Sequence, residues 1–139
     1  MRVLFDASAL AKRYIAEPGR EQLLALSAKA SEVVVAAHCK AEIASALNRQ
    51  RHEGVLADED YRRIMAVIHE DFAELECMAM DRRVEALAMA AMEATRLHAF
   101  DALPIGTAQA AGVDLFVTAD RRQAAAAAAV GLRTELIQA

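Results

Sequence analysis

The chain has 139 residues, of which 56% are hydrophobic, as expected for one domain with a buried core. Its formal charge of −4 at pH 7 argues against a protein that coats nucleic acid non-specifically, so nucleic-acid contact needs a local basic patch. The two cysteines are too few for a disulfide framework or a zinc site. No targeting segment is visible, and no apolar run approaches the about 18 residues of a membrane span. We therefore expect a cytoplasmic protein that does not contact a membrane.

The first apolar run, over residues 3–5, predicts a short strand that ends abruptly in a carboxylate, Asp6. A helix should follow from about Ser8 to Ala16. In an open α/β sheet, ligands bind in the crevice at the carboxyl ends of the strands, so an acid at this position indicates a site. The alternative, that Asp6 or Ser8 only caps the following helix, stays open on this stretch alone.

The middle of the chain continues with alternating strands and helices. The β-branched run over residues 33–36 predicts a buried parallel strand, and it lies between helices expected over about 21–30 and 39–52. Three acids at 58–60 then open a new helix, as helix N-termini favour. The apolar stripe of that helix consists of Tyr61, Ile64, Met65, Ile68, Phe72 and Leu75.

The second half repeats the alternation and sets the fold class. Its first predicted elements are a strand over 76–80, a helix capped by Asp81, a connection over 97–100 and a helix from Asp101 through Ala111. They are followed by a strand over 115–118, a helix after Asp120 through the alanine run 124–129, and a strand over 134–137. No hairpin signal, repeat or linker interrupts this order. We therefore expect a single α/β domain over residues 1–139, a three-layer α/β/α sandwich around a mainly parallel central sheet of about five strands.

Four acids stand at junctures that a parallel sheet brings toward one edge: Asp6, Glu42, Asp101 and Asp120. A pair of carboxylates at ~4 Å repels by ~1 kcal/mol in water and ~4 kcal/mol at an effective dielectric near 20. We therefore expect a raised pKa for at least one of them and something that offsets the repulsion. Ligand sets made only of oxygen atoms suit Mg²⁺ or Mn²⁺. Such ions can activate water and neutralise a phosphoryl oxygen in an in-line displacement.

Segments around these acids carry a family resemblance. The segments are Asp6-Ala7-Ser8-Ala9-Leu10, Lys12-Arg13-Tyr14 with Glu17-Pro18-Gly19, Glu42-Ile43-Ala44-Ser45-Ala46-Leu47, Asp101-Ala102-Leu103, and Leu115-Phe116-Val117-Thr118-Ala119-Asp120-Arg121-Arg122. In this order they resemble the PIN-domain nucleases, and more narrowly the VapC-like toxins of type II toxin–antitoxin systems. No single motif is specific, but the four acids with these flanks cover the whole chain.

The resemblance implies a PIN-like fold and a Mg²⁺- or Mn²⁺-dependent endoribonuclease that hydrolyses RNA phosphodiester bonds. It also implies a homodimer and a small antitoxin partner, which we expect to inhibit the site. The family's acidic residues carry over onto Asp6, Glu42, Asp101 and Asp120. The family's hydroxyl positions beside the metal match Ser8 and Thr118.

Two departures from the family pattern concern the second and third acids. Pro104 follows Asp101 closely, and a proline disfavours helical backbone just before it, so we expect this helix to start later. The turn before Glu42 contains His38 and lacks the usual Ser or Thr cap. A catalytically idle PIN-like module that binds RNA or a protein partner is therefore the alternative.

The remaining polar candidates are weaker. Four basic residues flank the acids and are candidate contacts to RNA phosphates or, alternatively, solvated helix faces: Lys12, Arg13, Arg121 and Arg122. The four histidines have no metal-ligand spacing, and only His38 lies near a proposed site residue. A haloacid-dehalogenase-type phosphatase would need an Asp at position 8, and a receiver domain would need a distal Lys; the chain has neither.

Overall fold

Five parallel strands form one sheet with the first strand of the chain at its centre. A computed structural model describes residues 1–139, and the strand order in it is β3-β2-β1-β4-β5. The strands are β1 (Arg2–Phe5), β2 (Glu32–Ala36), β3 (Glu76–Met78), β4 (Leu115–Thr118) and β5 (Thr134–Leu136). Every neighbouring pair is parallel, so the expected parallel sheet of about five strands is confirmed.

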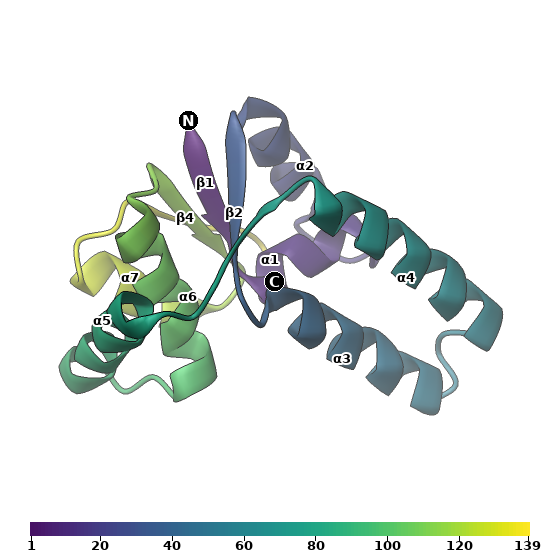
Figure 1. The fold of residues 1–139 in the computed structure, drawn as a ribbon. Helices are drawn as coiled ribbons and strands as arrows, with labels where there is room; N and C mark the ends of the chain where they lie inside the picture. Colours follow the sequence, from purple (N-terminus) through teal and green to yellow (C-terminus); the bar gives the residue numbers. More distant parts are fainter.

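Helices cover both faces of this sheet, which makes the three layers that the sequence predicts (Figure 1). The helices are α1 (Ala7–Leu10), the 3₁₀ helix η1 (Ala11–Arg13), α2 (Arg20–Lys29), α3 (Cys39–His52), α4 (Asp58–Ala73), α5 (Arg82–Ala94), α6 (Ala99–Ala111) and α7 (Arg121–Ala129). In Figure 1, α3 and α4 form a pair that extends away from the sheet, while α5, α6 and α7 gather on its opposite side. None of the helices is both long and apolar enough to span a membrane.

Alternation along β1 explains why the sheet carries two separate cores. Val3 and Phe5 lie in a core with α1, α2, α3 and α4, whereas Leu4 lies in a second core with α5, α6 and α7. All three side chains are fully buried. A central parallel strand that is covered on both faces must be apolar where it is buried, and β1 satisfies this from Val3 to Phe5, between the partly buried Arg2 and the buried Asp6.

A glycine allows α6 to pack directly against the backbone of α5. A Cβ atom on Gly106 would lie 2.6 Å from the carbonyl oxygen of Val84 and 2.7 Å from the amide nitrogen of Ala88. Real Cβ contacts are not this short, so only glycine fits this crossing. On its other side, α6 contributes Ile105 and Ala108 to the second core. This packing holds the helix that carries Asp101 against the sheet.

The course of α6 corrects one expectation. The helix does not start after Pro104: it begins at Ala99, so Asp101 lies within its first turn, and the proline is inside the helix. Pro104 has no amide hydrogen to donate to the carbonyl of Phe100, four residues earlier. His38 lies 2.9 Å from that carbonyl oxygen through Nε2, so the carbonyl still has a partner.

Smaller differences concern element ends and two side-chain types. The first helix ends as α-helix at Leu10 and continues only as one 3₁₀ turn, η1, rather than to Ala16. Met80 and Met89 are about half exposed, and Cys77 is exposed while Cys39 is buried. Cys77 lies on the edge strand β3, Met80 follows that strand, and Met89 lies on α5.

Candidate active site

Asp6 is a buried carboxylate that combines the two roles that the sequence left open. It follows β1, and its side chain caps α1 by accepting a hydrogen bond from the amide of Ala9 at 3.0 Å. The hydroxyls of Ser8 and Thr118 lie 2.8 and 2.9 Å from its carboxylate oxygens. Only 6% of the residue is exposed. Asp6 is therefore both a helix cap and the innermost acid of the site.

Burial raises the pKa of Asp6 from 3.8 to about 6. The hydrogen bonds from Ser8, Ala9 and Thr118 act in the opposite direction, and the charge of Glu42 raises the pKa further. The expected raised pKa is thus present, but its main cause is the loss of water around the carboxylate rather than crowding by other acids. A cation near Asp6 would favour its ionised form.

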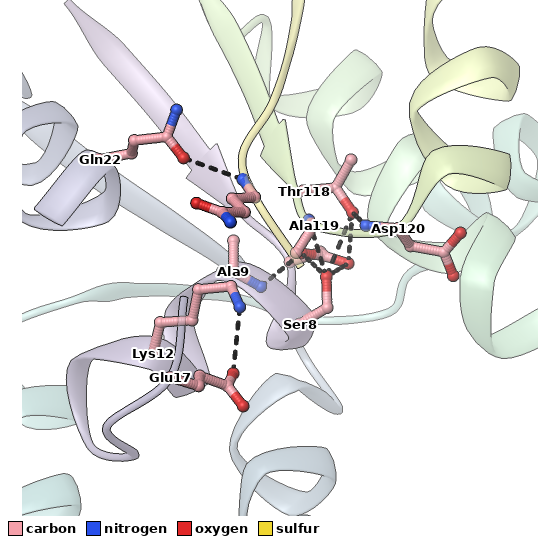
Figure 2. A network of polar contacts seen from close by, with 10 residues as sticks. Ser8, Ala9, Lys12, Glu17, Gln22, Thr118, Ala119 and Asp120 are labelled. Atoms are coloured by element: carbon pink, nitrogen blue, oxygen red, sulfur yellow. Dashed lines mark hydrogen bonds and ion pairs between the residues drawn. The ribbon is translucent and has the colours of Figure 1, made fainter. Parts of the chain in front are cut away.

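Ser8 and Thr118 connect Asp6 to the segment that carries Asp120 (Figure 2). The Ser8 hydroxyl accepts a hydrogen bond from the amide of Ala119 at 3.0 Å, and the Thr118 hydroxyl accepts one from the amide of Asp120 at 3.0 Å. The two hydroxyl oxygens lie 3.2 Å apart. These contacts fix the turn after β4 relative to the turn after β1.

Gln123 is a site residue that the sequence analysis did not identify. It is 2% exposed, its Oε1 lies 2.9 Å from the Thr118 hydroxyl, and its Nε2 donates to the backbone carbonyl of Asp101 at 2.7 Å. A buried amide needs hydrogen-bond partners on both of its ends, and here these partners belong to two different acidic segments. Gln123 therefore ties the first turn of α6 to the end of β4.

Glu42 and Asp101 approach the same region from α3 and α6. Glu42 lies in the first turn of α3, and its Oε1 is 2.8 Å from Nε2 of His38. The pKa of Asp101 is raised by partial burial first and then by the charges of Asp120 and Glu42. Since Glu42 also raises the pKa of Asp6, the four acids act on one another electrostatically.

The Asp120 side chain is engaged by the helix that follows it. Its Oδ1 accepts hydrogen bonds from the amides of Arg122 at 2.8 Å and Gln123 at 3.2 Å, so it caps α7. Figure 2 shows its side chain pointing away from Ser8. No group of three or more His, Cys, Asp and Glu side chains is arranged to hold a metal ion in this structure. The donor atoms themselves, carboxylate oxygens, are those that Mg²⁺ and Mn²⁺ prefer.

A groove of about 550 Å³ opens beside Glu42, the one of the four acids that lines it, and its other lining residues include Ser8, Lys12 and Arg49. Lys12 is 2% exposed, and its Nζ donates to Glu17 at 3.2 Å (Figure 2). Of the other predicted basic contacts, Arg13 lies 3.6 Å from Asp71, while Arg121 and Arg122 are exposed at the start of α7. Lys12 is thus the basic side chain of the predicted set that faces the groove.

Comparison with known proteins now gives the family. The sequence matches the PIN domain over residues 3–129, and the chain belongs to the PIN-domain family. No match was found among the curated proteins.

Solved structures share the fold at low sequence identity. VapBC2 from Rickettsia felis, bound to a DNA fragment from its promoter, superimposes with a TM-score of 0.70 at 13% identity, covering 97% of this chain and 98% of that one. VapBC from Salmonella typhimurium, bound to DNA, superimposes with a TM-score of 0.69 at 16% identity, covering 97% of this chain and 97% of that one. VapC20 of Mycobacterium tuberculosis, described as a sarcin-ricin loop cleaving toxin, superimposes with a TM-score of 0.67 at 17% identity, covering 89% of this chain and 94% of that one. At these identities the similarity establishes the fold.

Proposed function

We propose that this PIN-domain protein is a Mg²⁺- or Mn²⁺-dependent endoribonuclease and the toxin of a toxin–antitoxin pair. The family supports a nuclease, and structures of the same fold include a toxin–antitoxin complex and a toxin described as cleaving the sarcin-ricin loop. The single observation that carries the proposal is Asp6. An acid that costs stability when buried and ionised, placed at the end of the central strand within electrostatic range of Glu42, has a chemical rather than a packing purpose.

In this proposal Asp6, Glu42, Asp101 and Asp120 hold the metal ion. When bound, the ion supplies activation of water and neutralisation of the charge that develops on the phosphoryl oxygens. The protein's own contribution is orientation. Ser8 and Thr118 hydrogen-bond Asp6 and keep its carboxylate in one position, and Gln123 holds the backbone of Asp101. Asp120 keeps one oxygen on the α7 cap, which leaves its other oxygen for the site.

Basic side chains near the acids would position the RNA backbone. Lys12 lines the groove beside Glu42, and the exposed Arg121 and Arg122 follow Asp120 directly. Phosphate contacts of this kind fix the register of a nucleic acid without reading its sequence. The negative overall charge makes such local contacts necessary for any substrate with a phosphate backbone.

The proposed partners are an antitoxin and a second copy of this chain. The acidic site suits an antitoxin that inserts an arginine, because a guanidinium binds a carboxylate through two parallel hydrogen bonds. Sedimentation at micromolar concentration tests the homodimer, and a monomer there would contradict it. A complex in which the antitoxin leaves the acids open to metal would contradict the inhibitory insertion.

A cleavage assay tests the nuclease itself. Purified protein is incubated with a structured RNA in the presence of Mg²⁺, Mn²⁺ or excess chelator. We expect cleavage with either ion, none with chelator, and none from Asp6→Asn. Glu53→Gln is the matched control, since this exposed acid ends α3 without an ion pair, and it should cleave like wild type. Cleavage that persists in chelator or survives Asp6→Asn would contradict the proposal.

One observation favours the alternative of an idle PIN-like module that binds RNA or a protein. The four acids do not converge into a ready-made metal site: Asp120 is engaged as a cap, and Asp6 is already satisfied by three donors. This alternative predicts RNA or partner binding that is unchanged by Mn²⁺ and by Asp6→Asn. The same set of variants therefore separates the two functions.

A further inference from the structure

His38 contacts both α3 and α6 through a single ring nitrogen. Its Nε2 lies 2.8 Å from Oε1 of Glu42 and 2.9 Å from the carbonyl oxygen of Phe100. An ionised carboxylate and a carbonyl can only accept hydrogen bonds, so Nε2 carries the hydrogen whether the ring is neutral or charged. The His38 ring also stacks on the ring of Phe100, with centroids 5.5 Å apart and planes inclined by 29°.

The Phe100 carbonyl needs this donor because of a proline. In a regular helix this oxygen would accept from the amide of residue 104, but Pro104 has no amide hydrogen. The carbonyl lies in the first turn of α6, next to Asp101. The His38 side chain, from the turn between β2 and α3, thus supplies the hydrogen bond that the Phe100 carbonyl lacks inside α6.

We propose that His38 is a positioning residue that fixes the proposed metal ligand Glu42 against the first turn of α6 and so sets its separation from Asp101. This inference rests on the proposed function. Residues that hydrogen-bond a metal-binding carboxylate orient it and tune its affinity for the ion. The contact occupies one oxygen of Glu42 and leaves the other free. It also anchors the backbone beside Asp101, so one side chain orients two of the four acids.

Three features of the structure support this role over simple packing. The His38 side chain is 18% exposed and is not part of either hydrophobic core. It is the N-cap residue of α3, but its side chain makes no cap hydrogen bond to that helix. Its two polar contacts go instead to the segments that carry Glu42 and Asp101.

Mn²⁺ binding, measured by calorimetry, tests the positioning role without using activity. We expect His38→Ala to raise the dissociation constant for Mn²⁺ about tenfold or more. His38→Gln should recover most of the loss, because its side-chain amide also donates from a nitrogen at similar reach. His52→Ala, an exposed histidine at the end of the same helix, should bind like wild type. Wild-type affinity in His38→Ala, or no recovery in His38→Gln, would overturn the proposal.

A thermal unfolding cycle in chelator tests the link to Pro104. Pro104→Ala returns an amide hydrogen to position 104, so the Phe100 carbonyl no longer depends on His38. His38→Ala should lower the melting temperature by a few degrees in the wild-type background and by less in the Pro104→Ala background. Mn²⁺ affinity should stay low in the double variant, because the contact to Glu42 is still missing. Additive changes in melting temperature would overturn the link.

The two experiments also separate this inference from the proposed function. A wild-type protein that neither binds Mn²⁺ nor cleaves RNA would overturn the nuclease proposal and, with it, the metal-positioning role of His38. A wild-type protein that does both, together with an unaffected His38→Ala variant, would overturn the positioning role alone.

Discussion

The hydroxyl oxygen of Thr118 lies 2.9 Å from a carboxylate oxygen of Asp6, although the two residues are 112 positions apart in the chain. They meet because β1 and β4 are paired neighbours: Phe5 of β1 lies opposite Val117 of β4, and Asp6 and Thr118 are the next residues along the two strands. The strand order runs outward from β1 in both directions, so β1 and β4 flank the point where the order reverses. Open α/β sheets bind ligands at this point, which is where the buried acid lies.

The buried Asp6 should make the metal-free protein less stable as the pH rises. Its pKa is about 6 in the folded state and 3.8 as an ordinary Asp, so between these values the folded state binds the proton more strongly. The free energy of unfolding should therefore fall as pH rises from about 4 to about 6, by about 3 kcal/mol in total. Asp6→Asn should flatten this dependence and be more stable than wild type at pH 7. Denaturant unfolding in chelator at several pH values measures both effects.

Glu53→Gln is the control for this experiment, since it removes an exposed acid without an ion pair and should leave the pH dependence unchanged. Equal slopes for wild type and Asp6→Asn between pH 4 and 6 would show that the burial of Asp6 does not govern acid stability.

Asp101→Asn should raise the melting temperature of the metal-free protein at pH 7. The substitution keeps the side-chain shape and removes the carboxylate charge. Burial and the charges of Asp120 and Glu42 disfavour that charge, as the raised pKa of Asp101 shows. Adding Mn²⁺ should raise the melting temperature of wild type, because an ion that binds only the folded state stabilises it. The melting temperature of Asp101→Asn should rise by less. The measurement is thermal unfolding in chelator and then in Mn²⁺. A lower melting temperature for metal-free Asp101→Asn would indicate a structural role in the first turn of α6.

Gly106→Ala should destabilise the protein by about 1–3 kcal/mol, the usual cost of forcing extra atoms into a packed core. Its new methyl group would meet the backbone of α5 at Val84 and Ala88, and backbone cannot rotate away as a flexible side chain can. Gly54→Ala is the comparison, because its methyl group meets nothing within 4 Å and only its positive φ is unfavourable. Denaturant unfolding should give the larger loss for Gly106→Ala, and equal losses would contradict the tight crossing of α5 and α6.

The double variant Arg121→Ala, Arg122→Ala should weaken RNA binding and reduce its salt dependence. Each phosphate contact to single-stranded nucleic acid contributes about 0.7 to the slope of log affinity against log salt concentration. Both arginines are exposed, so the fold should be unaffected. Binding is measured over a salt series with Asp6→Asn as the uncleaving background. Arg62→Ala, Arg63→Ala on α4 is a charge-matched control, and an equal effect from it would show that the α7 arginines have no special role.

Local patterns were sufficient to predict the main elements of the fold, and they single out the four acids as site candidates that remain to be tested by mutation. The continuous apolar runs of β1, β2 and β4 are buried on both faces, and this pattern is distinct from that of an amphipathic helix such as α4. Asp6 directly follows β1 and Asp120 lies two residues after the end of β4, so a parallel sheet places them at the same edge whatever the details of packing.

The remaining parts of the site depend on contacts between distant segments, which local patterns do not record. Gln123 is an ordinary polar residue before an alanine run, and its burial results from Thr118 and the Asp101 carbonyl. Pro104 was expected to delay α6 by its local preference. The tertiary contact from His38, together with packing of α6 on α5 and β2, overrides that preference.

The central place of β1 has a consequence for how the protein is made. Because β1 precedes β4 in the chain, its second edge is paired only after β4 has been synthesised, and only then can Thr118 reach Asp6 and Gln123 reach Asp101. A nascent chain that stops short of residue 115 has Asp6 but not the surroundings that bury and orient it. For the nuclease proposed above, the site is therefore incomplete until the segment that carries Thr118 and Gln123 has been made.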